Sequence, residues 1–156
     1  MEASPLTITA SDGKEKLRLL ATQGVNRLSF GIQSFNDEVL RVAGRGYTKS
    51  IAIEACKLAQ HYFTNWNIDL IQSLSKSSLA EIQENLAIIK HLKPPHITWY
   101  NARFSNNRPQ GKMRQDPSWQ ESFPQEKEIV IGRAIIWQEL IKMGYSQIDG
   151  NRFVSN

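Results

Sequence analysis

The chain has 156 residues, a length that suits one globular domain, and 40% of them are hydrophobic. Its formal charge of +4 comes from basic residues scattered along the sequence, so a nucleic-acid partner is not favoured. The single cysteine, Cys56, excludes an internal disulfide and any multi-cysteine metal or cluster site supplied by this chain alone.

The sequence also bears on location. No apolar run approaches the roughly 18 residues that a membrane-spanning helix needs, and the N-terminal segment does not resemble a signal peptide. We therefore expect a cytoplasmic protein without a membrane partner. Cys56 lies in an amphipathic segment, which favours a small core residue over a reactive thiol.

Helical and strand periodicities alternate along the chain. Apolar residues at helical spacing predict helices at 14–23, 35–44, 49–63, 79–92 and 126–144. Apolar runs and alternation predict strands at 27–33, 67–71 and 96–104. Asn36 or Asp37 and Ser78 suit helix N-caps, and Gly44 and Gly144 suit helix ends. Three alternations with long connections predict an α/β fold with a parallel sheet covered by helices.

Polar residues fall where such a sheet binds ligands. Gln33 ends the first strand, Asp69 lies in the second, Arg103 ends the third, and Glu2 precedes a short extended segment. The carboxyl ends of parallel strands meet at one edge, where a carboxamide, a carboxylate and a guanidinium can bind a ribose, an amine and a carboxylate. The alternative is that each side chain caps a neighbouring loop.

Three segments carry a family resemblance. EASPLTI, KLRLLATQGVNRLSFGIQSFND and NIDLI resemble, in this order, the radical S-adenosylmethionine superfamily, and within it the oxygen-independent coproporphyrinogen III oxidase-like branch. The similarity runs from about residue 2 to residue 103 and continues more thinly in KMGYSQIDGNRF. It implies a partial (β/α) barrel with parallel strands, about the second half of a (β/α)6 barrel.

The resemblance implies binding of S-adenosylmethionine and a role for each matching residue. Glu2 matches a carboxylate that contacts the methionyl amine, and Gln33 a glutamine on the ribose side. Arg45 matches an arginine that pairs with the methionyl carboxylate. Asp69 matches an aspartate that binds the ribose hydroxyls, and Ile71 an apolar residue near the adenine. Taken alone, Arg45 also suits a surface position in a Gly-rich loop.

The chain departs from the family pattern at the iron–sulfur cluster. Family members bind a [4Fe–4S] cluster through C-x-x-x-C-x-x-C, which this sequence lacks, so we expect no cluster ligand and no catalytic residue from this chain. Residues 1–104 are expected to form the partial barrel, 105–125 a polar loop or insertion, and 126–156 a final helix and the start of a truncated C-terminal region. QSLSKSS replaces the family's Y-G-L-P-x-Q-T beside the adenine.

Several functions remain open at this stage. The resemblance implies an ancestral role in porphyrin and haem biosynthesis, the radical oxidative decarboxylation of coproporphyrinogen III, in a protein inactive alone. Alternatives are a haem chaperone, a radical methyltransferase, or a non-enzymatic nucleotide- or RNA-binding module. The last alternative would use aromatic and basic side chains, namely Trp66, Trp99, Tyr100, Arg103 and Arg108. Exposed edges at 27–33 or 96–101 predict association with the missing barrel half or with another copy.

Overall fold

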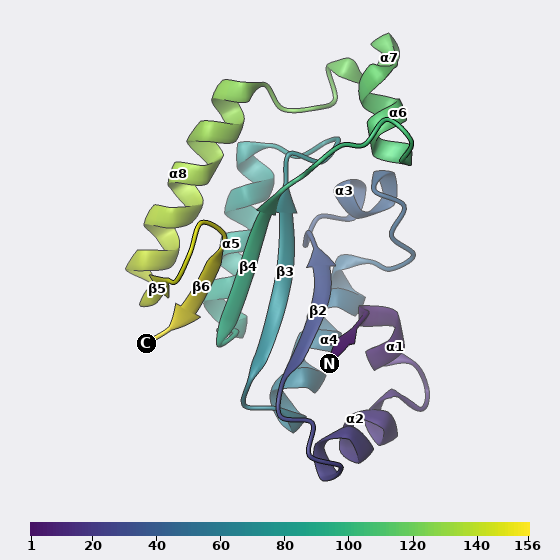
Figure 1. Cartoon of the computed structure of the whole chain (residues 1–156), viewed down its shortest axis with the longest axis vertical. Helices are drawn as coiled ribbons and strands as arrows, with labels where there is room; N and C mark the ends of the chain where they lie inside the picture. Colours follow the sequence, from purple (N-terminus) through teal and green to yellow (C-terminus); the bar gives the residue numbers. More distant parts are fainter.

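A six-stranded sheet with helices against one face organises the chain in the computed structural model, which describes all residues 1–156 (Figure 1). The strands are β1 (Glu2–Ala3), β2 (Leu28–Gln33), β3 (Trp66–Gln72), β4 (His96–Asn101), β5 (Tyr145–Gln147) and β6 (Arg152–Ser155). Their order is β1-β2-β3-β4-β6-β5. The first four are parallel, so the predicted parallel α/β architecture is confirmed.

The helices connect and cover these strands. They are α1 (Pro5–Thr9), α2 (Gly13–Thr22), α3 (Asp37–Val42), α4 (Lys49–Tyr62), α5 (Leu79–Leu92), α6 (Pro109–Gln115), α7 (Pro117–Gln120) and α8 (Glu126–Lys142). As predicted, Asn36 caps α3 and Ser78 caps α5 with side-chain oxygens. None of the helices combines the length and apolar character needed to cross a membrane.

One face of the sheet forms the hydrophobic core with α4 and α5. Alternate strand residues such as Phe30, Ile68 and Trp99 point to this side and are at most 2% exposed. Cys56 is fully buried here, as expected of a core residue. The opposite side of β2, β3 and β4, which we call the inner face, carries no helix in Figure 1.

The structure corrects the expectation about sheet edges. The strands at 27–33 and 96–101 were expected to be edges, but β1 pairs with β2 and β6 pairs antiparallel with β4. The residues after the final helix, for which no strand was predicted, form the β5–β6 hairpin that supplies this cover. The outermost strands are therefore β1 and β5.

Residues 105–125 follow the carboxyl end of β4 and contain α6 and α7, two short helices that begin with proline at N1 or N2. This segment, which we call the cap, is held at the carboxyl edge by backbone and side-chain contacts. Lys76 N donates to Ser122 O, and Gln110 Nε2 donates to Val42 O at 3.0 Å, at the end of α3. The cap therefore lies over the edge where the predicted site residues lie (Figure 1).

Candidate functional site

Four side chains from three strands form a hydrogen-bonded network on the inner face. Asn67 Nδ2 donates to Ser29 Oγ and to Asp69 Oδ1, both at 2.9 Å. Ser29 Oγ lies 3.4 Å from Asp69 Oδ2, and Thr98 Oγ1 donates to Asn67 Oδ1 at 3.1 Å. Thr98 and Asn67 are 3% exposed, whereas Asp69 keeps a partly exposed carboxylate. The network fixes that carboxylate at the open surface.

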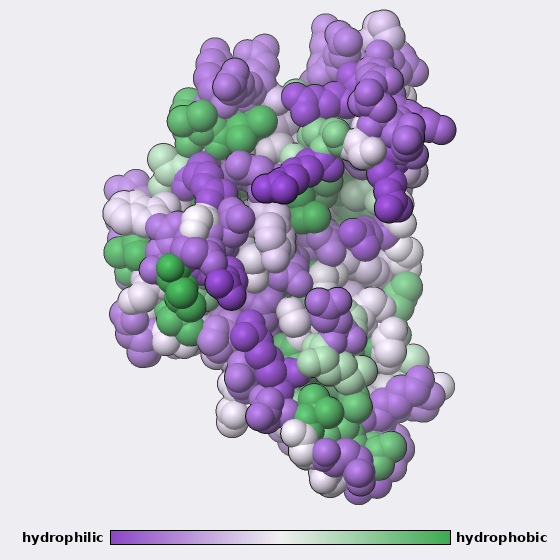
Figure 2. Space-filling model, in the orientation of Figure 1, coloured by the Kyte–Doolittle hydropathy of each residue, from purple (hydrophilic) through white to green (hydrophobic).

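Only Asp69 of this network was predicted from the sequence. Asn67 lies two residues before Asp69 and therefore on the same face of β3, and register pairs it with Ser29. The alternation of Asn67 and Asp69 was a signal in the sequence, but a single polar residue is also common at either end of an apolar strand. Figure 2 shows white and purple surface over the middle of this face and an apolar patch near α2.

Gln33 lies at the end of β2, as predicted, in an unusual conformation. A register shift occurs between Gly31 and Gln33, and Gln33 has φ of 65°, in the left-handed region. Its side-chain amide folds back against Gly31, so that Gln33 Nε2 occupies the place that a Cβ atom on Gly31 would take. Gly31 pairs with Asp69 in the ladder, so the carboxamide and the carboxylate share the inner face. Gln33 is 9% exposed, and its Oε1 is buried with no hydrogen-bond partner.

Two further predicted residues also belong to this face by register. Glu2 pairs with Ser29 across β1 and β2 and is exposed. Ile71 pairs with Tyr100 across β3 and β4, one inner-face step beyond Asp69, and both keep exposed surface. The structure thus assembles four of the six predicted residues on one surface: Glu2, Gln33, Asp69 and Ile71.

The two predicted arginines lie outside the strands. Arg45 is exposed in the loop after α3, as a surface arginine would be. The neighbouring Tyr47 hydroxyl donates to Gly31 O at 2.9 Å and Ile32 O at 3.1 Å, so the loop is fastened to the end of β2. Burial raises the pKa of Tyr47 to about 12, and the Arg45 charge acts in the opposite direction. Arg45 thus lies two residues before a side chain that is bonded to the end of β2.

Arg103 does not end the third strand as expected. β4 ends at Asn101: Ala102 N makes the last backbone bond to β3, donating to Gln72 O, and the chain then leaves the sheet for the cap. Arg103 is exposed and forms no hydrogen bond or ion pair within the chain. It belongs with the cations of the cap rather than with the inner face.

The cap carries positive charge and a small apolar cavity. Its three cations, Arg108, Lys112 and Arg114, form no ion pairs, and neither do two cations beside it, Lys76 and Arg103. Figure 2 shows strongly hydrophilic surface over α6 and α7. The Arg114 guanidinium lies 4.8 Å from the Phe104 ring, and Phe104 meets Phe123 edge-on at 5.4 Å. These side chains line a cavity of about 150 Å³ that also reaches Ser73.

Comparison with known proteins decides the family. Residues 1–89 match the sequence profile described as the Radical SAM superfamily. The chain belongs to the radical SAM superfamily. It is 35% identical over 108 residues to "Heme chaperone HemW" of Haemophilus influenzae, covering 69% of this chain and 27% of that protein. It is 34% identical over 101 residues to "Oxygen-independent coproporphyrinogen-III oxidase-like protein HemZ" of Bacillus subtilis, covering 64% and 19%.

A solved structure has the same fold. Coproporphyrinogen III oxidase (HemN) from Escherichia coli superposes with a TM-score of 0.84 at 24% identity, covering 99% of this chain and 34% of that one. The predicted partial radical SAM barrel and the coproporphyrinogen III oxidase-like branch are thereby confirmed. This radical SAM chain spans 27% of the length of its Haemophilus relative.

The inner face fits the chemistry of S-adenosylmethionine. Gln33 Oε1 is a buried acceptor without a donor, and the Asp69 carboxylate is fixed by its neighbours with part of it exposed. An ammonium or a ribose hydroxyl would supply the missing donor, and a vicinal diol suits a carboxylate. The donor set does not fit a [4Fe–4S] cluster, because the one cysteine is buried in α4 and no three metal-binding side chains meet.

Proposed function

We propose that this chain provides the S-adenosylmethionine-binding surface of a haem-related radical SAM protein. In the proposed site, Asp69 holds the ribose hydroxyls, Gln33 accepts a hydrogen bond on the ribose side, and Glu2 faces the methionyl amine. Arg45 pairs with the methionyl carboxylate, and Ile71 contacts the adenine. The observation that carries the proposal is the unpartnered Gln33 Oε1 on the same face as the fixed Asp69 carboxylate.

Bound S-adenosylmethionine supplies the hydrogen-abstracting radical chemistry that gives the superfamily its name. The residues of this chain bind and orient it, and the iron–sulfur cluster that this chemistry requires must be held by residues outside this sequence. The apolar surface beside β1, a cavity of about 200 Å³ lined by residues such as Ala3, Leu19 and Leu20, supports docking of the missing barrel strands there.

Binding can be tested on the chain as it is. Titration calorimetry and ligand-observed NMR with S-adenosylmethionine and 5′-deoxyadenosine should show binding that weakens about tenfold or more in Asp69→Asn, because a hydrogen bond to a charged group contributes roughly 1.5–3 kcal/mol. Glu54→Gln, an exposed change on α4, is the matched control and should bind normally. Undiminished binding by Asp69→Asn, or no binding at millimolar ligand, would overturn the proposal.

The substrate is proposed to be a carboxylated tetrapyrrole, in a haem-chaperone type of role rather than in coproporphyrinogen oxidation. Relatives named as haem chaperones support this choice. The five cations in and beside the cap form no ion pairs and therefore suit an anionic ligand. Haem should quench tryptophan fluorescence with an affinity that falls as salt rises and falls further in Arg114→Gln. Arg18→Gln on α2 is the control, since its side chain pairs with Glu15 at the other end of the molecule. Stronger binding to coproporphyrin III than to haem would favour the oxidase role.

A further inference from the structure

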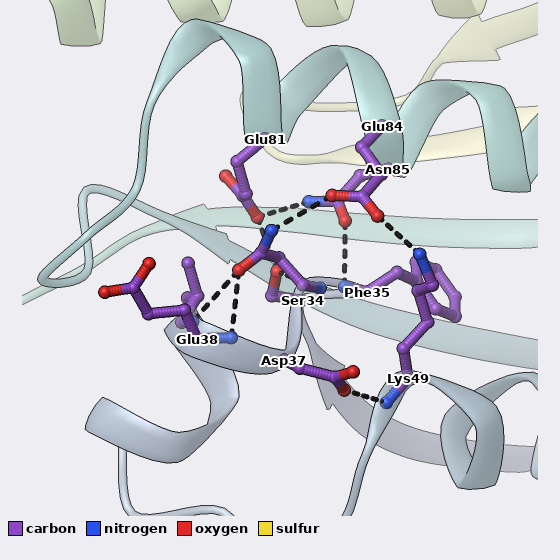
Figure 3. A network of polar contacts seen from close by, with 10 residues as sticks. Ser34, Phe35, Asp37, Glu38, Lys49, Glu81, Glu84 and Asn85 are labelled. Carbon is purple, nitrogen blue, oxygen red and sulfur yellow. Dashed lines mark hydrogen bonds and ion pairs between the residues drawn. The ribbon is translucent and has the colours of Figure 1, made fainter.

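The turn that follows Gln33 is bonded to helix α5 at three successive residues, Ser34, Phe35 and Asn36 (Figure 3). Ser34 Oγ donates to Glu81 Oε1 at 2.5 Å, and Phe35 N donates to Asn85 Oδ1 at 2.8 Å. Asn85 Nδ2 also donates to Glu81 Oε1 at 2.5 Å, so the two α5 side chains act on the turn together. These contacts join residues 47 and 50 positions apart in the sequence and fix the backbone after Gln33.

Gln33 depends on its neighbours for its conformation. A left-handed backbone costs a residue with a side chain roughly 1–2 kcal/mol, so surrounding contacts must maintain it. On the preceding side, Tyr47 bonds the carbonyls of Gly31 and Ile32. On the following side, the α5 contacts hold Ser34 and Phe35. Gln33 Oε1 has no hydrogen-bond partner, so no bond from this atom maintains the conformation of Gln33.

Glu81 is an unusual residue for a purely structural position. It is 4% exposed and its Oε2 has no partner, an arrangement that costs more than an apolar side chain of similar size. Burial raises the pKa of the Glu81 carboxyl, the bonds from Ser34 and Asn85 lower it, and the Glu84 charge raises it. Lys49 of α4 pairs with Glu84 at 2.6 Å rather than with Glu81, so no cation neutralises Glu81 directly.

We infer that Glu81 and Asn85 are positioning residues for ligand binding. By bonding Ser34 and Phe35 they hold Gln33 in the left-handed conformation that places its carboxamide over Gly31, next to Asp69. This inference rests on the proposed function only where it concerns the ligand. The placement of Gln33 is a property of the free chain and is tested there.

Two substitutions separate hydrogen bonding from filling of space. Glu81→Gln keeps the acceptor and the volume, and should leave the NMR signals of the Gln33 side-chain amide at their wild-type positions. Glu81→Leu keeps most of the volume but removes the acceptor, and should shift or broaden those signals. Ser34→Ala removes the same hydrogen bond with almost no change in volume, and it also removes the bond that Asn36 N donates to Ser34 Oγ at 3.0 Å. Unmoved Gln33 signals in this variant therefore count against the positioning role even if Glu81→Leu does not fold. Gln83→Leu, an exposed change on the same helix, is the control.

The ligand readout distinguishes the two ideas. Affinity for S-adenosylmethionine should fall by up to about fivefold in Glu81→Leu or Ser34→Ala, because the one ligand hydrogen bond of Gln33 is worth about 1 kcal/mol, and should be restored in Glu81→Gln. Unmoved Gln33 signals in Ser34→Ala, or equal disruption by Glu81→Gln and Glu81→Leu, would overturn the positioning role. If the Gln33 signals move as expected but the wild-type chain binds no S-adenosylmethionine, the positioning role stands and the proposed function fails.

Discussion

Gly31 is the residue whose substitution most directly tests how the Gln33 carboxamide is placed. A methyl group at Gly31 would occupy the space of Gln33 Nε2, the far end of a flexible side chain, and would meet no backbone atom. Gly31 does not have a positive φ, so alanine can adopt its backbone conformation. Gly31→Ala should therefore move the Gln33 amide and leave the strand in place.

The expected energies are small for folding and larger for binding. Alanine reduces the freedom of the unfolded chain, which stabilises by about 0.4–1 kcal/mol. Forcing the Gln33 side chain from its rotamer costs about 0.5–1.5 kcal/mol, so the two effects nearly cancel. Loss of one ligand hydrogen bond, about 1 kcal/mol, should weaken S-adenosylmethionine binding about fivefold.

Urea denaturation and calorimetric titration measure these two quantities. Gly150→Ala is the matched control, because the nearest atom to its new methyl group is 3.9 Å away, on Arg133, in the turn between β5 and β6. We expect that control to bind as the wild type does. A Gly31→Ala chain destabilised by more than about 3 kcal/mol would show that the backbone, not the side chain, absorbs the overlap. Unchanged affinity would show that the Gln33 amide does not contact the ligand.

Three further outcomes follow from buried groups. Tyr47→Phe removes the hydroxyl proton that the carbonyls of Gly31 and Ile32 share, and should lower the free energy of unfolding by about 0.5–1.5 kcal/mol in urea; an unchanged midpoint would mean that this bond contributes nothing. The Cys56 thiol, whose pKa burial raises, should react with a disulfide reagent only in denaturant, and fast reaction in buffer would contradict its placement. Because the pKa of Glu81 is raised on folding, the folded state binds its proton more tightly, so this contribution to stability is full below about pH 4.3 and is lost as pH rises through the folded pKa. Denaturation from pH 4 to 8 should show that slope in the wild type and lose it in Glu81→Gln.

Periodicity predicted the helices and strands that have one buried side and one exposed side. The strands around Phe30, Ile68 and Trp99 alternate strongly because one side packs against helices, and their positions were correct to within a few residues. β5 and β6 were not predicted, since strands of three and four residues with mixed exposure carry almost no periodic signal. α6 and α7 lie in a polar segment with three prolines, and this composition is equally typical of a loop, so the two short helices were not predicted.

In the candidate site, too, local sequence predicted the strand positions but not the features that depend on long-range contacts. Periodicity was enough to place Gln33 at the end of one strand and Asp69 within the next, and their role in binding stays a prediction. The conformation of Gln33 was not predictable from local sequence, because it depends on Tyr47 and on side chains of α5 that lie about 50 residues away. Such long-range hydrogen bonds leave no local pattern. Ser29, Asn67 and Thr98 become recognisable as a set only when the register of three strands is known.

The polar inner face explains how a partial barrel can present a binding surface. A sheet covered by helices on one side exposes its other side unless further layers cover it, and an apolar face would then favour aggregation. Here Ser29, Asn67, Asp69 and Thr98 satisfy one another across three strands, so this face tolerates water while it holds a carboxylate in place. Exposed apolar side chains lie instead beside β1, where the proposed barrel strands would dock, and on α8. Asp69, on β3, lies away from the proposed docking surface beside β1, so variants of Asp69 should affect ligand binding without affecting barrel assembly.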